Sequence, residues 1–143
     1  MARQRVLFLC THNSARSQMA EGLLRARGGE AFEVHSAGTL ATTVRPEAIE
    51  VMRAIGIDIS DHTSKTLEAY INRHFDYVIT VCDSANEQCP IFPNADHRLH
   101  WSIEDPSDVE GDRPTRRDAF ITARDELAAR IEMLFDLDRT SSD

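Results

Sequence analysis

The segment from Cys10 to Ser17, "CTHNSARS", brings a thiol, an arginine and several hydroxyl groups close together. A hydrophobic core requires none of these groups, so the segment must either hold a ligand or react with one. It precedes a stretch predicted to be helical, and the first N–H groups of a helix lack intrahelical partners. These groups and the helix macrodipole favour an anion, and the Arg16 guanidinium can bind two oxygens of a tetrahedral oxyanion.

Cys10 lies at the centre of this predicted anion site and is therefore a candidate nucleophile. The local positive potential favours the thiolate, so we expect Cys10 to be ionised at neutral pH. Ser17 is expected to donate a hydrogen bond to the sulfur, and Asn13 suits a left-handed backbone conformation at the bend. Alternatively, Cys10 is an inert strand residue and Arg16 a surface helix residue. The Cys-x5-Arg-Ser pattern between a strand and a helix favours the reactive site.

The sequence predicts strands and helices that alternate along the chain and position these residues. An apolar run predicts a strand over 5–10 and a β-rich run one over 75–82, with further strand candidates at 32–38 and 97–101. Helical patterns cover 16–28, 46–56 and 115–137. This alternation predicts an α/β fold with a four-stranded parallel sheet flanked by helices on both faces. Ligands bind beyond the carboxyl ends of such strands. Cys10 and Cys82 both fall at predicted strand ends, so we expect them to be neighbours in space.

Length, charge and cysteine content limit the class of protein. A chain of 143 residues is expected to form one domain over 1–143, with a flexible tail over 139–143. The net charge of −8 disfavours nucleic acid and anionic membranes as partners. We expect a cytoplasmic protein, because no apolar run resembles a membrane span or a signal peptide. The three cysteines are few and odd in number, which disfavours a disulfide framework. Their spacing does not match that of metal ligands, so we expect no metal site.

"CTHNSARS" resembles the phosphate-binding loop of the low-molecular-weight protein tyrosine phosphatase family. The "EDP" at 104–106 resembles the second signature of that family, in which the aspartic acid protonates the leaving group. The similarity spans essentially the whole chain, including "SAG" at 36–38 and "GIDIS" at 56–60. It implies that Asp105 is the general acid. It also implies a substrate-binding loop made of Thr11, His12, Asn13, Ser14, Ala15, Arg16 and Ser17.

Within this family, "VCDSANEQCP" is similar to the redox loop of the thioredoxin-coupled arsenate reductases. The resemblance implies that Cys10 attacks arsenate, that Cys82 then attacks Cys10 to release arsenite, and that Cys89 finally attacks Cys82. Thioredoxin, itself kept reduced by electrons from NADPH, would reduce the disulfide and restore the thiols. Phosphatases of the family usually have aromatic residues after the Asp-Pro pair, whereas Ser107 and Asp108 stand there in this chain. A small inorganic oxyanion such as arsenate, or phosphate or sulfate as its analogue, therefore suits the site better than phosphotyrosine.

Several alternatives stay open. The chain could be a low-molecular-weight phosphatase that hydrolyses phosphomonoesters through a phosphocysteine, or a non-catalytic anion sensor. Glutaredoxin or mycothiol could replace thioredoxin as the reductant. We expect a monomer.

Three positions differ from the pattern of many relatives. His12 and Ala15 replace a glycine and a cysteine of the loop, and the His12 ring could add positive charge near the anion. In some relatives Asn, Glu, Ser and Asp bind a potassium ion, and the last of these positions is Lys65 here. The other three match Asn13, Glu21 and Ser36. Either the Lys65 ammonium group replaces the ion, so that no cofactor is needed, or Lys65 is a solvated surface charge.

Overall fold

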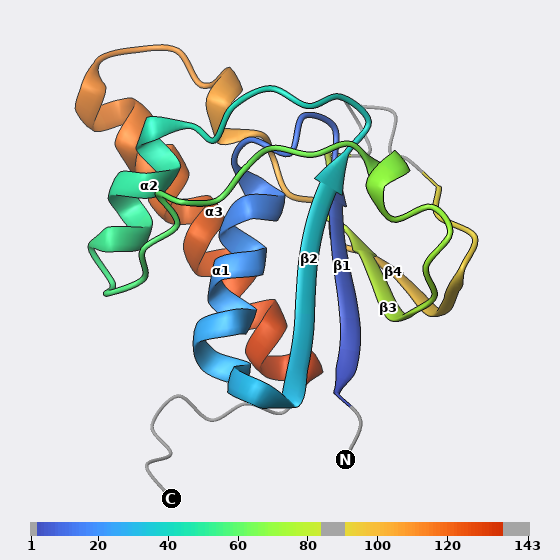
Figure 1. Cartoon of the computed structure of the whole chain (residues 1–143). Coiled ribbons are helices and arrows are strands. Elements are labelled where there is room, and N and C mark those ends of the chain that lie inside the picture. The colour runs from blue at the N-terminus through green and yellow to red at the C-terminus, as the bar shows by residue number, and fades with distance from the viewer. Residues whose placement is uncertain (1–2, 84–90, 136–143) are drawn as a thin grey trace, which may run out of the picture.

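Four parallel strands form a single sheet in the order β2-β1-β3-β4 (Figure 1). The computed structural model describes residues 3–83 and 91–135. The strands are β1 (Gln4–Cys10), β2 (Phe32–Gly38), β3 (Phe75–Thr80) and β4 (Ala95–His100). The helices are α1 (Arg16–Gly28), α2 (Pro46–Arg53) and α3 (Arg113–Leu134), with short 3-10 helices η1 (Gly29–Ala31), η2 (Leu67–Ala69) and η3 (Pro106–Asp108). The predicted four-stranded parallel sheet flanked by helices is confirmed, but the α-helices cover one face rather than both, and the segment around the short η2 covers the other.

The two faces of the sheet are covered by different kinds of structure. Side chains alternate along a strand, so Val6 and Phe8 share one face and Leu7 and Leu9 the other. The first pair belongs to the larger apolar cluster, which contains the buried faces of α1, α2 and α3. The second pair packs in a smaller cluster with Tyr70 and residues flanking η2. Figure 1 shows the three α-helices together on one side of the sheet.

The element boundaries differ by a few residues from those predicted. α3 begins two residues earlier, because the Asp112 side chain accepts a hydrogen bond from the Thr115 amide at 3.0 Å and caps the helix. β3 ends at Thr80, two residues before Cys82. α2 ends at Arg53, and the chain then turns through Gly56, whose φ is +83°. No helix of the described residues is long and apolar enough to cross a membrane.

Gly38, at the end of β2, lies against the backbone that follows β1. It pairs with Cys10 in the parallel register, and a Cβ atom at this position would lie 2.8 Å from both the Asn13 nitrogen and the Thr11 carbonyl oxygen. These are backbone atoms of the predicted anion-binding loop, so they cannot move aside without reshaping it. The glycine allows the loop to pack directly on β2.

We expect Gly38→Ala to lower the free energy of unfolding by roughly 1–3 kcal/mol and to weaken sulfate binding as well. Urea unfolding and sulfate titration measure the two effects. Gly29→Ala is the control: Gly29 has a positive φ of +60°, which strains an alanine, but a Cβ there meets no atom within 4 Å. That control should lose stability and keep sulfate affinity. Unchanged affinity in Gly38→Ala would contradict the role given to this contact.

Candidate active site

The loop between β1 and α1 surrounds the Cys10 sulfur with hydrogen-bond partners. Cys10 is a free thiol with 2% of its surface exposed. Its Sγ accepts a hydrogen bond from the Asn13 amide at 3.2 Å and lies 2.8 Å from the Ser17 hydroxyl oxygen. Asn13 has a φ of +50°, so the predicted left-handed bend is confirmed. The predicted contact between Ser17 and the sulfur is also present.

The Asn13 side chain fixes the direction of the Ser17 hydrogen bond. Its amide nitrogen donates to the hydroxyl oxygens of Ser17 and Ser36, at 2.8 and 2.9 Å. Its carbonyl oxygen accepts from the Gln18 side chain at 2.9 Å and from the Lys65 amide at 2.7 Å. Because Ser17 already accepts from Asn13, its own proton is available to the Cys10 sulfur. This arrangement suits a sulfur that carries negative charge.

Neighbouring segments hold the loop from outside. The amides of Leu40 and Arg45 donate to the carbonyl oxygens of Thr11 and Ser14, both at 2.9 Å. No side chain of the described residues caps the N-terminus of α1 at Ala15. The first N–H groups of this helix therefore keep their capacity to bind an anion.

Arg16 and Asp105, far apart in sequence, meet beside this loop. The Arg16 side chain is 2% exposed and donates from Nη1 to the Ile103 carbonyl oxygen at 2.9 Å. Its Nη2 lies 3.3 Å from Asp105 Oδ2. The other carboxylate oxygen of Asp105 accepts from the Ser107 amide at 2.9 Å and caps η3. The structure thus brings together the predicted anion-binding arginine and the predicted general acid.

Cys82 lies at the same edge of the sheet. The Val81 amide donates to the Leu9 carbonyl oxygen at 2.8 Å, so the chain after β3 runs beside the end of β1. Cys82 is fully buried and disulfide-bonded. The register therefore supports the prediction that Cys10 and Cys82 are neighbours. Cys89, and the tail predicted over 139–143, lie outside the described residues.

One of the positions that resemble a cation site is the basic Lys65, and a second, Glu21, is paired with Arg25. One Glu21 oxygen accepts from the Ser36 hydroxyl at 2.5 Å, and the other lies 2.7 Å from Arg25. The Lys65 ammonium group donates to the Thr63 carbonyl oxygen at 2.6 Å. Burial lowers the pKa of Lys65, and the negative charge of Glu21 opposes that shift. The described residues contain no group of three or more His, Cys, Asp or Glu side chains arranged for a metal.

Sequence reasoning missed Gln18 and His62, which support the loop. The Gln18 amide nitrogen donates to Thr63 and Asn13 acceptors, so its oxygen must accept the proton of His62 Nδ1 at 3.1 Å. Burial lowers the pKa of His62, which favours the neutral ring. Sequence offered no signal for a contact over this separation. Arg25 was missed too, although its spacing of four residues from Glu21 is typical of a helical ion pair.

A polar pocket of about 350 Å³ lies on the outer side of the loop. It is lined by His12, Ser14, Thr42, Thr43, Arg45, Asp105, Ser107 and Asp108. None of these residues is a phenylalanine, tyrosine or tryptophan, as expected from the residues that follow the Asp-Pro pair. The lining suits a small polar ligand better than an aryl group.

Comparisons with known proteins find similar chains among the arsenate reductases. The arsenate reductase of Shouchella clausii (strain KSM-K16) is 41% identical over 132 residues, which cover 92% of this chain and 95% of that protein. A solved structure described as an arsenate reductase in the phosphate binding state gives a TM-score of 0.80 at 33% identity, over 93% of this chain and 97% of the other. The thioredoxin-dependent arsenate reductase of Corynebacterium glutamicum gives 0.71 at 33% identity, over 94% of this chain and 61% of the other.

The family model described as low molecular weight phosphotyrosine protein phosphatase matches residues 5–141. This match includes the loop at Cys10, the Asp105-Pro106 pair and every strand and helix of the fold. The chain therefore belongs to the low molecular weight phosphotyrosine protein phosphatase family.

Proposed function

We propose that this protein reduces arsenate to arsenite through the Cys10 thiolate and a thiol–disulfide relay that thioredoxin recycles. The observation that carries the proposal is the Cys10 sulfur itself, held by the Asn13 amide and the Ser17 hydroxyl beside a buried Arg16–Asp105 pair. Relatives named arsenate reductase support the choice of substrate. One solved relative, described as thioredoxin-dependent, supports the choice of reductant.

In the first step, Arg16 and the amides of the loop bind the arsenate oxygens. The Cys10 thiolate attacks arsenic, and an arsenic–oxygen bond breaks. Asp105 donates its proton to the departing hydroxide, which leaves as water. The charged donors of the loop stabilise the negative charge that gathers on the remaining oxygens.

In the second step, the Cys82 thiolate attacks the Cys10 sulfur. The sulfur–arsenic bond breaks, its electron pair stays on arsenic, and arsenite leaves with arsenic reduced by two electrons. A Cys10–Cys82 disulfide forms, and Cys89 then attacks Cys82, which frees Cys10. Thioredoxin, kept reduced by NADPH, reduces the resulting Cys82–Cys89 disulfide. The course of the chain after β3, beside the end of β1, supports the first of these exchanges.

Cys82→Ser tests the relay. We expect arsenite production to fall to the background rate, because nothing else attacks the Cys10 adduct. Hydrolysis of an aryl phosphate uses only Cys10, Arg16 and Asp105, so it should stay within about twofold of its original rate and serves as the control. Arsenite measured by chromatography reports the loss. Continued multiple turnover in the variant would refute the proposed relay.

A phosphatase that hydrolyses phosphomonoesters through a phosphocysteine is the second candidate. The family model supports it, and the reductase and phosphatase reactions use the same loop and acid. The polar lining of the pocket beside the loop favours arsenate reduction, because its described residues offer no phenylalanine, tyrosine or tryptophan side chain to a tyrosyl ring. The ratio of arsenate reduction to aryl phosphate hydrolysis under the same conditions distinguishes the two.

We also propose that Lys65 and Arg25 make a potassium ion unnecessary. Both oxygens of Glu21 already have partners, and the nearby Lys65 side chain adds a second positive charge. A cation would have to displace these groups, so the residues present do not fit one. The alternative, a solvated Lys65, is less consistent with its half-buried position.

The expected result is equal kcat/KM in potassium and sodium chloride at matched ionic strength. Lys65→Asp should acquire a potassium response of severalfold. A potassium response in the unaltered protein would contradict the proposal.

The same proposal places the protein in the cytoplasm as a monomer. The reductant supports the compartment, because thioredoxin keeps thiols reduced there. Light scattering during size-exclusion chromatography measures the mass of the eluting protein, and a monomer should give about 16.1 kDa.

A further inference from the structure

We propose that Arg45 is a second cationic side chain that binds the oxyanion, acting from the rim of the site opposite the buried Arg16. This inference rests on the oxyanion chemistry proposed above. It adds a residue outside the Cys-x5-Arg-Ser loop and assigns it a preference for doubly charged anions.

The position of Arg45 is fixed by the loop itself. Its amide donates to the Ser14 carbonyl oxygen at 2.9 Å, and Pro46 follows it as the first residue of α2. Its side chain lines the pocket that also contains His12, Ser14 and Asp105. The Arg45 backbone is therefore fixed beside the loop, and its side chain lies at this pocket.

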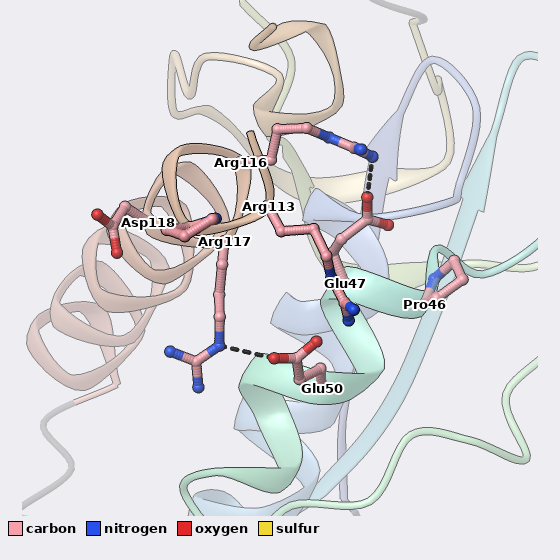
Figure 2. A pocket seen from close by; sticks show the side chains of 8 residues that line it. Pro46, Glu47, Glu50, Arg113, Arg116, Arg117 and Asp118 are labelled. Carbon is pink, nitrogen blue, oxygen red and sulfur yellow. Dashed lines mark hydrogen bonds and ion pairs between the residues drawn. The ribbon is translucent and has the colours of Figure 1, made fainter. Parts of the chain in front are cut away.

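The Arg45 side chain has unused hydrogen-bonding capacity. Among the described residues, its Nε atom is buried and has no hydrogen-bond partner. The carboxylate of Glu47 lies 3.8 Å away, too far for a hydrogen bond, and its other oxygen is bound by Arg116 from α3. Figure 2 shows Glu47 directed toward Arg116, and Glu50 toward Arg117, so these two carboxylates have partners of their own. A buried donor without an acceptor is unfavourable, so a ligand that accepts a hydrogen bond from it is favoured.

A second polar atom in the same pocket is also unpartnered. The Ser107 hydroxyl oxygen is buried and has no hydrogen-bond partner within the described part of the chain. Ser107 lines the pocket from η3, whereas Arg45 lines it from the start of α2. Two segments that line one polar pocket thus each contain a buried polar atom with unmet capacity, and a ligand with several acceptor oxygens would supply the missing partners.

The negative charges around the pocket explain why a dianion would need a second positive side chain. The protein carries a net charge of −8, and Asp105 and Asp108 both lie at the pocket, so an approaching dianion meets repulsion. The positive charge of Arg16 is partly neutralised by Asp105 at 3.3 Å. Arg45 supplies a second positive charge, which a dianion needs more than a monoanion of the same shape does.

The test compares the binding of sulfate, a tetrahedral dianion, with that of perchlorate, a tetrahedral monoanion. We expect Arg45→Gln to weaken sulfate binding by about tenfold, the size of one lost charge-assisted contact. Perchlorate binding should weaken by less than about threefold. Glu47→Gln removes the carboxylate nearest to Arg45 and should strengthen sulfate binding by a few-fold. Arg117→Gln is the matched control, since that arginine pairs with Glu50 away from the loop, and it should change neither affinity.

Calorimetric titration of the reduced protein measures the affinity for each anion. Steady-state kinetics with arsenate measure KM and kcat. Arg45→Gln should raise KM for arsenate with little change in kcat, because a rim residue contributes to capture rather than to the reaction at arsenic. Equal losses for sulfate and perchlorate, or unchanged sulfate affinity, would overturn the role of Arg45. If the unaltered protein binds sulfate but does not reduce arsenate, the proposed function fails while the test of Arg45 remains valid.

Discussion

Replacing Cys10 with serine is expected to lower the rate of arsenite formation from arsenate by at least about 10⁴-fold. Cys10 Sγ is the atom that forms the bond to arsenic, and a serine hydroxyl is a far weaker nucleophile than a cysteine sulfur. The surrounding loop should survive, because serine can accept the hydrogen bonds that Asn13 and Ser17 now direct to the sulfur. The rate of arsenite formation with thioredoxin and NADPH measures the effect.

Sulfate binding provides the control for Cys10→Ser. The amides of the loop and the Arg16 guanidinium do not depend on the sulfur, so the variant should bind sulfate within about threefold of the original affinity. Loss of binding together with loss of activity would mean that the loop had collapsed, and Cys10→Ala would then replace serine as the probe. Substantial arsenite formation by either variant would contradict nucleophilic attack by Cys10.

Arg16→Lys is expected to lower kcat/KM for arsenate by roughly 10²–10³-fold. Arginine offers a planar fork that binds two oxygens, whereas lysine offers one compact charge. The substitution also disrupts the contacts that Arg16 makes to the Ile103 carbonyl oxygen and to Asp105 within the buried site. The free energy of unfolding should therefore fall by about 1–3 kcal/mol.

The kinetic and structural effects of Arg16→Lys can be separated. Kinetics are measured well below the unfolding temperature of the variant, where nearly all molecules are folded. Arg25→Lys is a control, since Arg25 is an arginine of the same helix that pairs with Glu21 away from the sulfur. It should alter kcat/KM by less than about fivefold. If Arg16→Lys kept kcat/KM within fivefold of the unaltered protein, oxyanion binding would not depend on the two hydrogen bonds that the arginine fork can donate.

The sequence was sufficient to predict the parallel sheet and the reactive loop. The apolar run that becomes β1 is short and continuous, and the pattern of α1 begins directly after the loop. The left-handed Asn13 and the Ser17 contact followed from local chemistry, because each lies within seven residues of Cys10. Predictions of this kind depend on neighbours in the chain, which sequence displays directly.

The supporting network could not be predicted in the same way. His62 reaches Gln18 across 44 residues, and Lys65 reaches Asn13 across 52. Such contacts depend on how distant segments pack, and no local pattern records them. The unequal covering of the two sheet faces has the same origin, because the segment around η2 carries no helical periodicity. The pairing of Glu47 with Arg116 was likewise visible only in the fold.

The most direct test of the account is a free-thiol count with disulfide mapping, before and after a single turnover with arsenate and no external reductant. The reduced chain starts with three thiols. The proposed mechanism predicts the loss of two thiols, a Cys82–Cys89 disulfide, a free Cys10 and one arsenite per protein molecule. Three intact thiols after exposure to arsenate, with an aryl phosphate cleaved at a useful rate, would contradict it and identify a phosphatase.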